Sequence, residues 1–263
     1  MYKRIVVPVD LTREFDNVLD VAGTLARRMA AAVRLVTVAS PNLDHDVDER
    51  DLAALARRVL APQVETAMIE SNDVAGALLD AVADDELLCI ETRAHGPFAS
   101  FVLGSVANDV LFRATLPLLL VGPAVKPAPL DGVLQVCIDG PDAAAALVPV
   151  AGAWGRDLDL HVRVVNVWAP HDGDVHTADQ LVADAVRRLH EQFDLDADGE
   201  VLHSPVPALA IVDDERGHDA AVVCVAVRPR SSFHRRVLGS VADGVAHAAT
   251  APVLAVPCRL AAR

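Results

Sequence analysis

An internal repeat constrains the fold of this chain more than any other feature of its sequence. Residues 102–121 read VLGSVANDVLFRATLPLLLV and residues 237–256 read VLGSVADGVAHAATAPVLAV, so corresponding positions lie 135 residues apart throughout. Two earlier segments also match, because IVVPVD at 5–10 and LQVCID at 134–139 are both apolar runs that end in aspartate. In a chain of 263 residues, this repeat predicts two complete domains rather than a solenoid of short units.

The segment between the two copies has the composition of a linker. Residues 122–132 read GPAVKPAPLDG, with three prolines and two glycines between the last apolar run of one copy and the first of the next. We therefore place the boundary at about residue 128 and expect domains at 1–127 and 128–263.

Apolar runs and helical segments alternate within each copy. Aromatic residues make up only 3% of the chain and hydrophobic residues 52%, so the core must consist of Val, Leu, Ile and Ala. This alternation predicts a doubly wound α/β fold with a mostly parallel sheet. Thr12 is expected to cap a helix that ends near Ala31, and Ser105 to begin one that ends near Thr115. The strands expected in the first copy are Ile5–Val9, Val33–Val38, Val64–Ile69, Leu87–Glu91 and Leu118–Val121, and the second copy should repeat them.

Ligands of such sheets bind beyond the carboxyl ends of the strands, where the strand order reverses. A Gly-Ser pair at a helix start can offer backbone N–H groups and a hydroxyl to an anion, although Ser is also an ordinary helix cap. The aspartate after the first strand can accept hydrogen bonds from a ribose or a base, or can cap the next turn. The residues in these places are Asp10, Val38, Glu91 and Gly104, with the counterparts Asp139, Val167, Ala226 and Gly239.

The chain resembles the universal stress protein family in three features. In each copy the first strand ends in an acidic residue, as in VD, a βα unit ends in a short strand before proline, and the last segment has the pattern LGSVA-x-x-V-x-x-x-A-x-x-P-[VL]-L-x-V. The likeness covers nearly the whole chain, twice. It implies two five-stranded domains of the adenine nucleotide alpha hydrolase-like type, related by a pseudo-two-fold axis. It also implies pairing through edge strands near Leu118–Val121 and Val253–Val256, the same strands through which we expect a homo-oligomer.

The resemblance extends to ATP binding in part. ATP-binding members carry G-x-x-G, nine residues, then G-[ST], but here the early glycine positions hold Glu91 and Ala94 in one copy and Ala226 and Pro229 in the other. Glu91 adds negative charge near phosphates, and Pro229 removes an N–H donor. The second copy compensates with Arg228, Arg230, His234, Arg235 and Arg236, whereas the first has only Arg93 and His95. The candidate nucleotide-binding residues are Asp139, Val167, Ala226, Arg228, Gly239, Ser240 and Val241, with Asp10, Val38, Gly104, Ser105 and Val106 as weaker candidates.

Charge and motifs narrow the function classes. The formal net charge of −14 disfavours nucleic acid and anionic membranes as partners. No long apolar run or signal-peptide pattern is present, which predicts a cytoplasmic protein. We expect the four cysteines to be buried and reduced, and the polar segment 171–176, HDGDVH, to bind no metal.

No catalytic motif occurs in the sequence. The first hypothesis is a non-catalytic stress-response regulator that binds an adenine nucleotide or another anion, with ATP and Mg²⁺ as its cofactor or with none. The alternatives are an interaction module that acts only through an unidentified protein partner and a weak ATP-hydrolysing enzyme.

Overall fold

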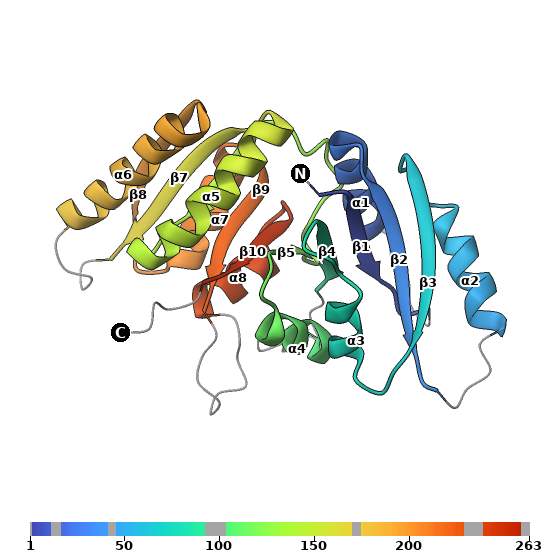
Figure 1. The fold of residues 1–263 in the computed structure, drawn as a ribbon. Coiled ribbons are helices and arrows are strands. Elements are labelled where there is room, and N and C mark those ends of the chain that lie inside the picture. Colours follow the sequence, from blue (N-terminus) through green and yellow to red (C-terminus); the bar gives the residue numbers. More distant parts are fainter. Residues whose placement is uncertain are drawn as a thin grey trace.

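A computed structural model of the chain describes residues 2–11, 17–41, 46–92, 104–169, 175–228 and 239–258. Within these ranges, helices and strands alternate along each half (Figure 1). The first half contains β1 (Arg4–Pro8), α1 (Asn17–Met29), β2 (Ala32–Ala39), α2 (Asp46–Ala56), β3 (Gln63–Glu70), α3 (Val74–Asp80), β4 (Glu86–Glu91), α4 (Ser105–Arg113) and β5 (Leu118–Val121). The second half contains β6 (Val133–Cys137), α5 (Pro141–Leu158), β7 (His161–Trp168), α6 (Val175–Phe193), β8 (Ala197–His203), α7 (Pro207–Gly217), β9 (Ala220–Val227), α8 (Ser240–Ala248) and β10 (Val253–Pro257).

The sheet topology confirms the predicted fold. The described strands form one sheet in the order β3-β2-β1-β4-β5-β10-β9-β6-β7-β8, in which each half is parallel and repeats the order of the other. The five strands expected in the first copy agree with β1 to β5 within one residue at each end. The helix expected from Thr12 is described only from Asn17, and it ends two residues early because Ala30 adopts a left-handed φ of 51°.

The two halves join through their last strands, as the resemblance implies. β5 and β10 pair antiparallel, with Leu119 opposite Leu254, while every other strand pair in the sheet is parallel. These strands therefore pair with each other inside one chain and lie in the middle of the sheet. Its outer described strands are β3 and β8, so a homo-oligomer through β5 and β10 is not the arrangement found here.

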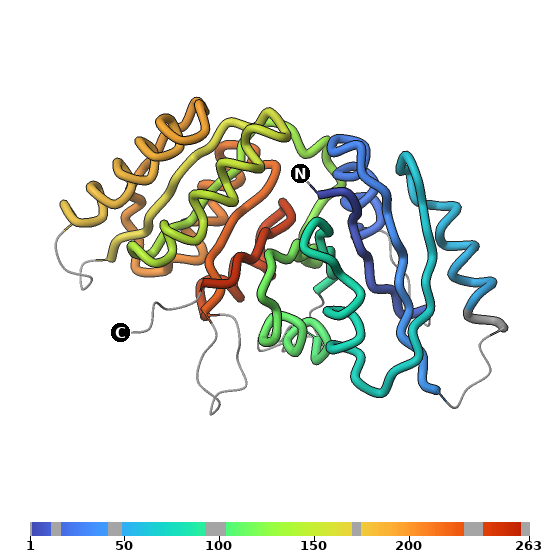
Figure 2. Tube along the Cα trace, in the orientation of Figure 1, coloured from blue at the N-terminus to red at the C-terminus, as the bar shows by residue number. Residues whose placement is uncertain are grey.

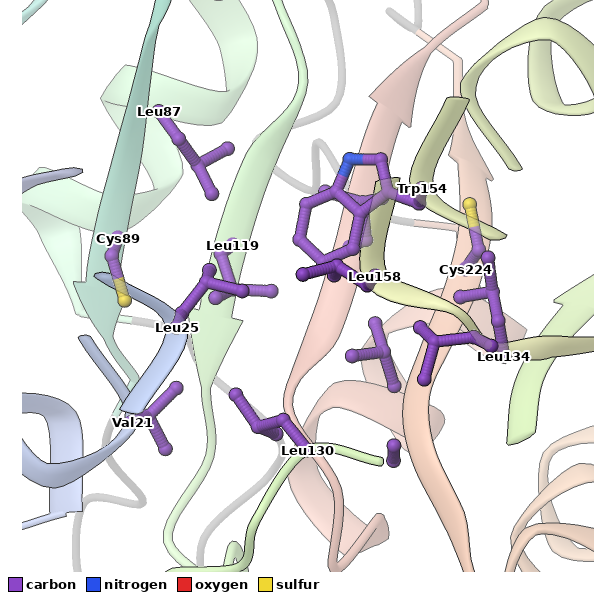
Figure 3. Close-up of a cluster of buried hydrophobic side chains, with 14 of the residues drawn as sticks. Val21, Leu25, Leu87, Cys89, Leu119, Leu130, Leu134, Trp154, Leu158 and Cys224 are labelled. Carbon is purple, nitrogen blue, oxygen red and sulfur yellow. The ribbon is translucent and has the colours of Figure 1, made fainter. Parts of the chain in front are cut away.

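Helices cover both faces of the sheet (Figure 2), and alternate strand residues enter two separate cores. One core lies under α1, α2, α5 and α6, and the other lies under α3, α4, α7 and α8. The first core contains side chains from both halves, including Leu25 and Leu119 from one and Leu134 and Trp154 from the other (Figure 3). The two halves thus share a hydrophobic core as well as a sheet.

The segment between β5 and β6 is more ordered than a loose linker. Val125 and Leu130 are buried in the shared core, and the Lys126 N–H donates to the Thr250 carbonyl at 2.9 Å. Arg28 of α1 donates to the carbonyls of Leu130 and of Leu158 at the end of α5. The segment therefore fixes the halves against each other, and the boundary at residue 128 stays a prediction.

The cysteines are unpaired, as expected. Cys89, Cys224 and Cys258 are buried, whereas Cys137 is only partly so. Burial raises the pKa of all four thiols, which remain protonated at neutral pH.

Candidate functional site

The strand order reverses between β6 and β9 in the second half and between β1 and β4 in the first. Cys137 at the end of β6 is in register with Val165 of β7 on one side and Val225 of β9 on the other. Asp139 therefore follows β6 at the level of Val167 and Val227, at the carboxyl edge of the sheet. The register places the predicted strand-end residues of the second half side by side.

The helix after β9 contributes the Gly-Ser pair at the same edge. A helix that connects two neighbouring parallel strands runs against them, so the N-terminus of α8 lies at their carboxyl ends. Gly239 is the N-cap and Ser240 the first helical residue, and no side chain of the described residues caps this helix. The first half repeats this with Gly104 and Ser105 at α4. The reading of these serines as helix caps is therefore wrong, because each lies one position inside its helix.

The two cap glycines have no structural requirement for glycine among the described residues. The φ of Gly104 is −51° and that of Gly239 is −61°, both of which any residue adopts. A Cβ added at either would meet no atom of the described residues within 4 Å. By contrast, a Cβ on Gly122 would lie 2.3 Å from the Ala246 carbonyl oxygen, so packing explains that glycine.

Arg228 and Asp139 form the main charged contact of this edge. Arg228 directly follows β9, and its Nη1 and Nη2 donate to Asp139 Oδ2 and Oδ1 at 2.5 and 2.6 Å. The contact is a bidentate ion pair, and the carboxylate raises the pKa of the guanidinium further. The Arg228 side chain is 34% exposed and that of Asp139 63% exposed, so solvent reaches the pair.

Cys258 and the start of α5 border this pair. The Cys258 N–H donates to the Val227 carbonyl at 2.8 Å, and its Sγ donates to the Asp142 carbonyl at 3.3 Å. Asp142 lies in the first turn of α5, whose N-cap, Gly140, has no capping side chain among the described residues. Two carboxylates, of Asp139 and Asp142, therefore lie near one guanidinium.

Other residues near this edge were not singled out from the sequence. Buried Asn166 of β7 donates from Nδ2 to the Ile138 carbonyl at 2.7 Å, which fixes the backbone just before Asp139. Trp168 and His203, which end β7 and β8, meet edge to face with ring centroids 5.4 Å apart. The one sequence signal for Asn166 is a polar residue inside the apolar run HVRVVNVW.

The candidate residues at the strand ends and the helix start of the first half lie within the described ranges. Asp10 is exposed, Val38 and Glu91 are partly buried, and Val106 on α4 is exposed. The other predicted residues of the two loops lie outside the described residues, namely Arg93, Ala94, His95, Pro229, Arg230, His234, Arg235 and Arg236.

The described ranges contain neither a cluster of metal-ligating side chains nor a membrane-spanning helix. No group of three or more His, Cys, Asp or Glu side chains is placed to hold a metal ion there, and residues 171–174 lie outside those ranges. None of the described helices combines the length and apolar content that a membrane span requires.

Comparison with known proteins gives a consistent result for both halves. The family model described as "Universal stress protein family" matches residues 1–122 and 134–257. A universal stress protein of Mycobacterium tuberculosis is 23% identical over 205 residues, which are 73% of this chain and 68% of that protein. A solved universal stress protein from Archaeoglobus fulgidus aligns with a TM-score of 0.73 and 19% identity over 96% of this chain and 97% of its own. A functionally unknown protein from Pseudomonas aeruginosa aligns with a TM-score of 0.69 and 14% identity over 98% and 93%. These two structural matches show the shared fold.

Proposed function

This chain belongs to the universal stress protein family, and from that premise we propose that it is a non-catalytic, cytoplasmic stress-response regulator with one adenine-nucleotide or anion site in its second half. The site comprises Asp139, Val167, Ala226, Arg228, Gly239, Ser240 and Val241. The corresponding residues Asp10, Val38, Gly104, Ser105 and Val106 form a weaker site or none. We also propose domains at 1–127 and 128–263.

One observation carries the proposal. Gly239 caps a helix at the carboxyl edge of the sheet, yet neither its backbone conformation nor packing against described residues calls for glycine. A glycine at such a place lets a ligand approach the backbone, and the N–H groups of the first helical turn favour a negative charge there. Phosphate oxygens of an adenine nucleotide, with or without Mg²⁺, fit this chemistry.

Arg228 supports the second half as the working copy. Its guanidinium lies at the strand ends where the sheet order reverses and can hold a phosphate through charge-assisted hydrogen bonds. At the register position where the first half has the acidic Glu91, the second half has the uncharged Ala226. The electrostatic environment is therefore more favourable to an anion in the second half.

Ligand-dependent stabilisation tests the proposal. We expect millimolar ATP with Mg²⁺ to raise the melting temperature of the parent protein, since a ligand at 100 times its Kd adds about 2.7 kcal/mol. Gly239→Glu should abolish this shift by placing a bulky negative group at the site. Gly217→Glu is the matched control, because a Cβ at Gly217 also meets no described atom within 4 Å and this glycine ends α7 at the opposite edge.

A third variant, Gly104→Glu, separates the two halves. If it removes the shift while Gly239→Glu does not, the site lies in the first half and the assignment is wrong. If the parent shows no shift, the protein is better explained as an interaction module acting through a protein partner. Steady release of phosphate from ATP by the purified protein would contradict the non-catalytic part of the proposal.

A further inference from the structure

Arg228 and Asp139 form a closed, two-pronged ion pair at the carboxyl edge of the sheet. The two oxygens of Asp139 accept from the two terminal nitrogens of Arg228 at 2.5 and 2.6 Å, a fork that satisfies the planar recognition edge of the guanidinium. The residues are 89 positions apart and reach each other from the ends of two neighbouring strands. This geometry leaves the Nη1–Nη2 edge of Arg228 occupied by the protein's own carboxylate.

A phosphoryl group presents the same kind of acceptor edge as a carboxylate and carries up to two negative charges. One guanidinium edge serves one bidentate acceptor at a time, so a phosphoryl group can use it only after the carboxylate leaves. We propose that Arg228 anchors a phosphoryl group in the second-half site and that Asp139 is a built-in competitor, which the ligand must displace. This inference rests on the proposed function of that site.

The surroundings favour such an exchange over a permanent structural pair. Solvent reaches both side chains, and exposed ion pairs of this kind contribute little to folding stability. Asp142 adds a second carboxylate near Arg228, so among the described residues two carboxylates surround one guanidinium. A singly charged or neutral ligand gains little by entering, whereas a phosphoryl dianion replaces a monoanion at the guanidinium. The site should therefore select ligands by their phosphoryl charge, with the competitor setting the threshold.

Three variants separate the role of Asp139 as competitor from that of Arg228 as anchor. Binding of ATP, pyrophosphate, inorganic phosphate and adenosine is measured by isothermal titration calorimetry at one fixed ionic strength. Asp139→Asn keeps the shape of the side chain and removes its charge, and we expect it to tighten ATP and pyrophosphate about three- to ten-fold. Arg228→Gln should weaken both at least about ten-fold. The double variant Asp139→Asn/Arg228→Gln should bind like Arg228→Gln alone, because the competitor acts only through the anchor.

Asp84→Asn controls for the change in net charge, since Asp84 is exposed and precedes β4 at the opposite edge of the sheet. It should leave all four affinities unchanged. The pyrophosphate and phosphate arms show whether the phosphoryl group alone is recognised, and adenosine shows what the base contributes. Asp139 is exposed and Arg228 partly exposed, and matching circular dichroism spectra will confirm that the variants fold.

The outcomes distinguish this inference from the function it rests on. If Asp139→Asn weakens ATP as Arg228→Gln does, Asp139 contacts the ligand and is no competitor. If the parent binds ATP and loses it with Gly239→Glu, but neither Asp139→Asn nor Arg228→Gln changes the affinity, the inference fails and the site stands. If no phosphoryl ligand binds the parent or Asp139→Asn, both the site and the inference fail.

Discussion

The shared core predicts that the two halves unfold together, and Leu25→Ala tests this. Leu25 of α1 in the first half is fully buried, at 0% exposure, in the core that also contains Leu134 and Trp154 of the second half (Figure 3). Removing three buried carbons costs their transfer free energy plus that of the cavity, which for Leu→Ala substitutions amounts to about 2–5 kcal/mol. In a single cooperative unit, the whole of this loss lowers the stability of both halves.

The positions of the tryptophans provide the assay. Both tryptophans of the chain belong to the second half, but Trp154 of α5 meets Tyr2 of the first half edge to face, with ring centroids 6.2 Å apart. In a Trp154→Phe background, the fluorescence of Trp168 at the end of β7 therefore reports on the second half, whereas far-ultraviolet circular dichroism reports on both halves. In urea titrations, Leu25→Ala should lower the unfolding midpoint equally by the two probes. Leu60→Ala, at a side chain that is 71% exposed, should change the unfolding free energy by less than about 0.5 kcal/mol. An unmoved fluorescence midpoint beside a shifted dichroism transition would refute the single unit.

Two further predictions concern a helix cap and the thiols. Asp73 caps α3 by accepting a 3.0 Å hydrogen bond from the Gly76 N–H, whereas Val206, in a similar backbone conformation, caps α7 without a side-chain hydrogen bond. We therefore expect Val206→Asp to stabilise the protein by about 1 kcal/mol and to raise its melting temperature by about 2–4 °C. A melting temperature that falls or stays unchanged in calorimetry would contradict this. Because burial raises the pKa of all four thiols, a thiol-reactive dye at pH 8 should label fewer than one cysteine per folded chain and all four after unfolding in guanidinium. Fast labelling of the folded protein would show that a thiol is reachable and ionised.

The sequence sufficed for the fold because parallel strands buried on both faces are apolar runs with a definite length. Val33–Val38 and Leu118–Val121 could be recognised without any partner, and the repeat then supplied the second half. The prediction of a linker was only partly correct. Prolines and glycines indicated a connection between the halves, but Val125 and Leu130 of this segment are buried in the core that the halves share. Burial of isolated apolar residues in a connection depends on tertiary packing, which local composition does not encode.

The candidate site shows a similar limit. Arg228 and Asp139 were both predicted as site residues, but their pairing was not, because it depends on the sheet register that brings β6 next to β9. Of the two roles considered for Ser240, the helix cap is wrong, since Gly239 is the cap, and a Gly-Ser pair at a helix start is compatible with either residue in that position. Residue types could be predicted from the sequence, whereas contacts between strand ends required the structure.

A comparison of the two halves indicates which polar residues bear on function. Val6 of β1 and Gln135 of β6 occupy the same register position in the two halves, opposite Arg34 of β2 and Arg163 of β7. The Gln135 amide donates to Asp214 at 2.7 Å, so a hydrogen-bonded side chain occupies the buried position that the apolar Val6 has in the first half.

Either solution fills the interior, so a polar cluster by itself is a packing alternative and no sign of a ligand. Gly104 and Gly239 differ from these positions, because both halves keep glycine where no contact of the described residues explains it. Since neither backbone conformation nor packing among the described residues calls for glycine at these two positions, we favour a ligand as the explanation, and the response of Gly239→Glu to ATP bears most directly on the function of the chain.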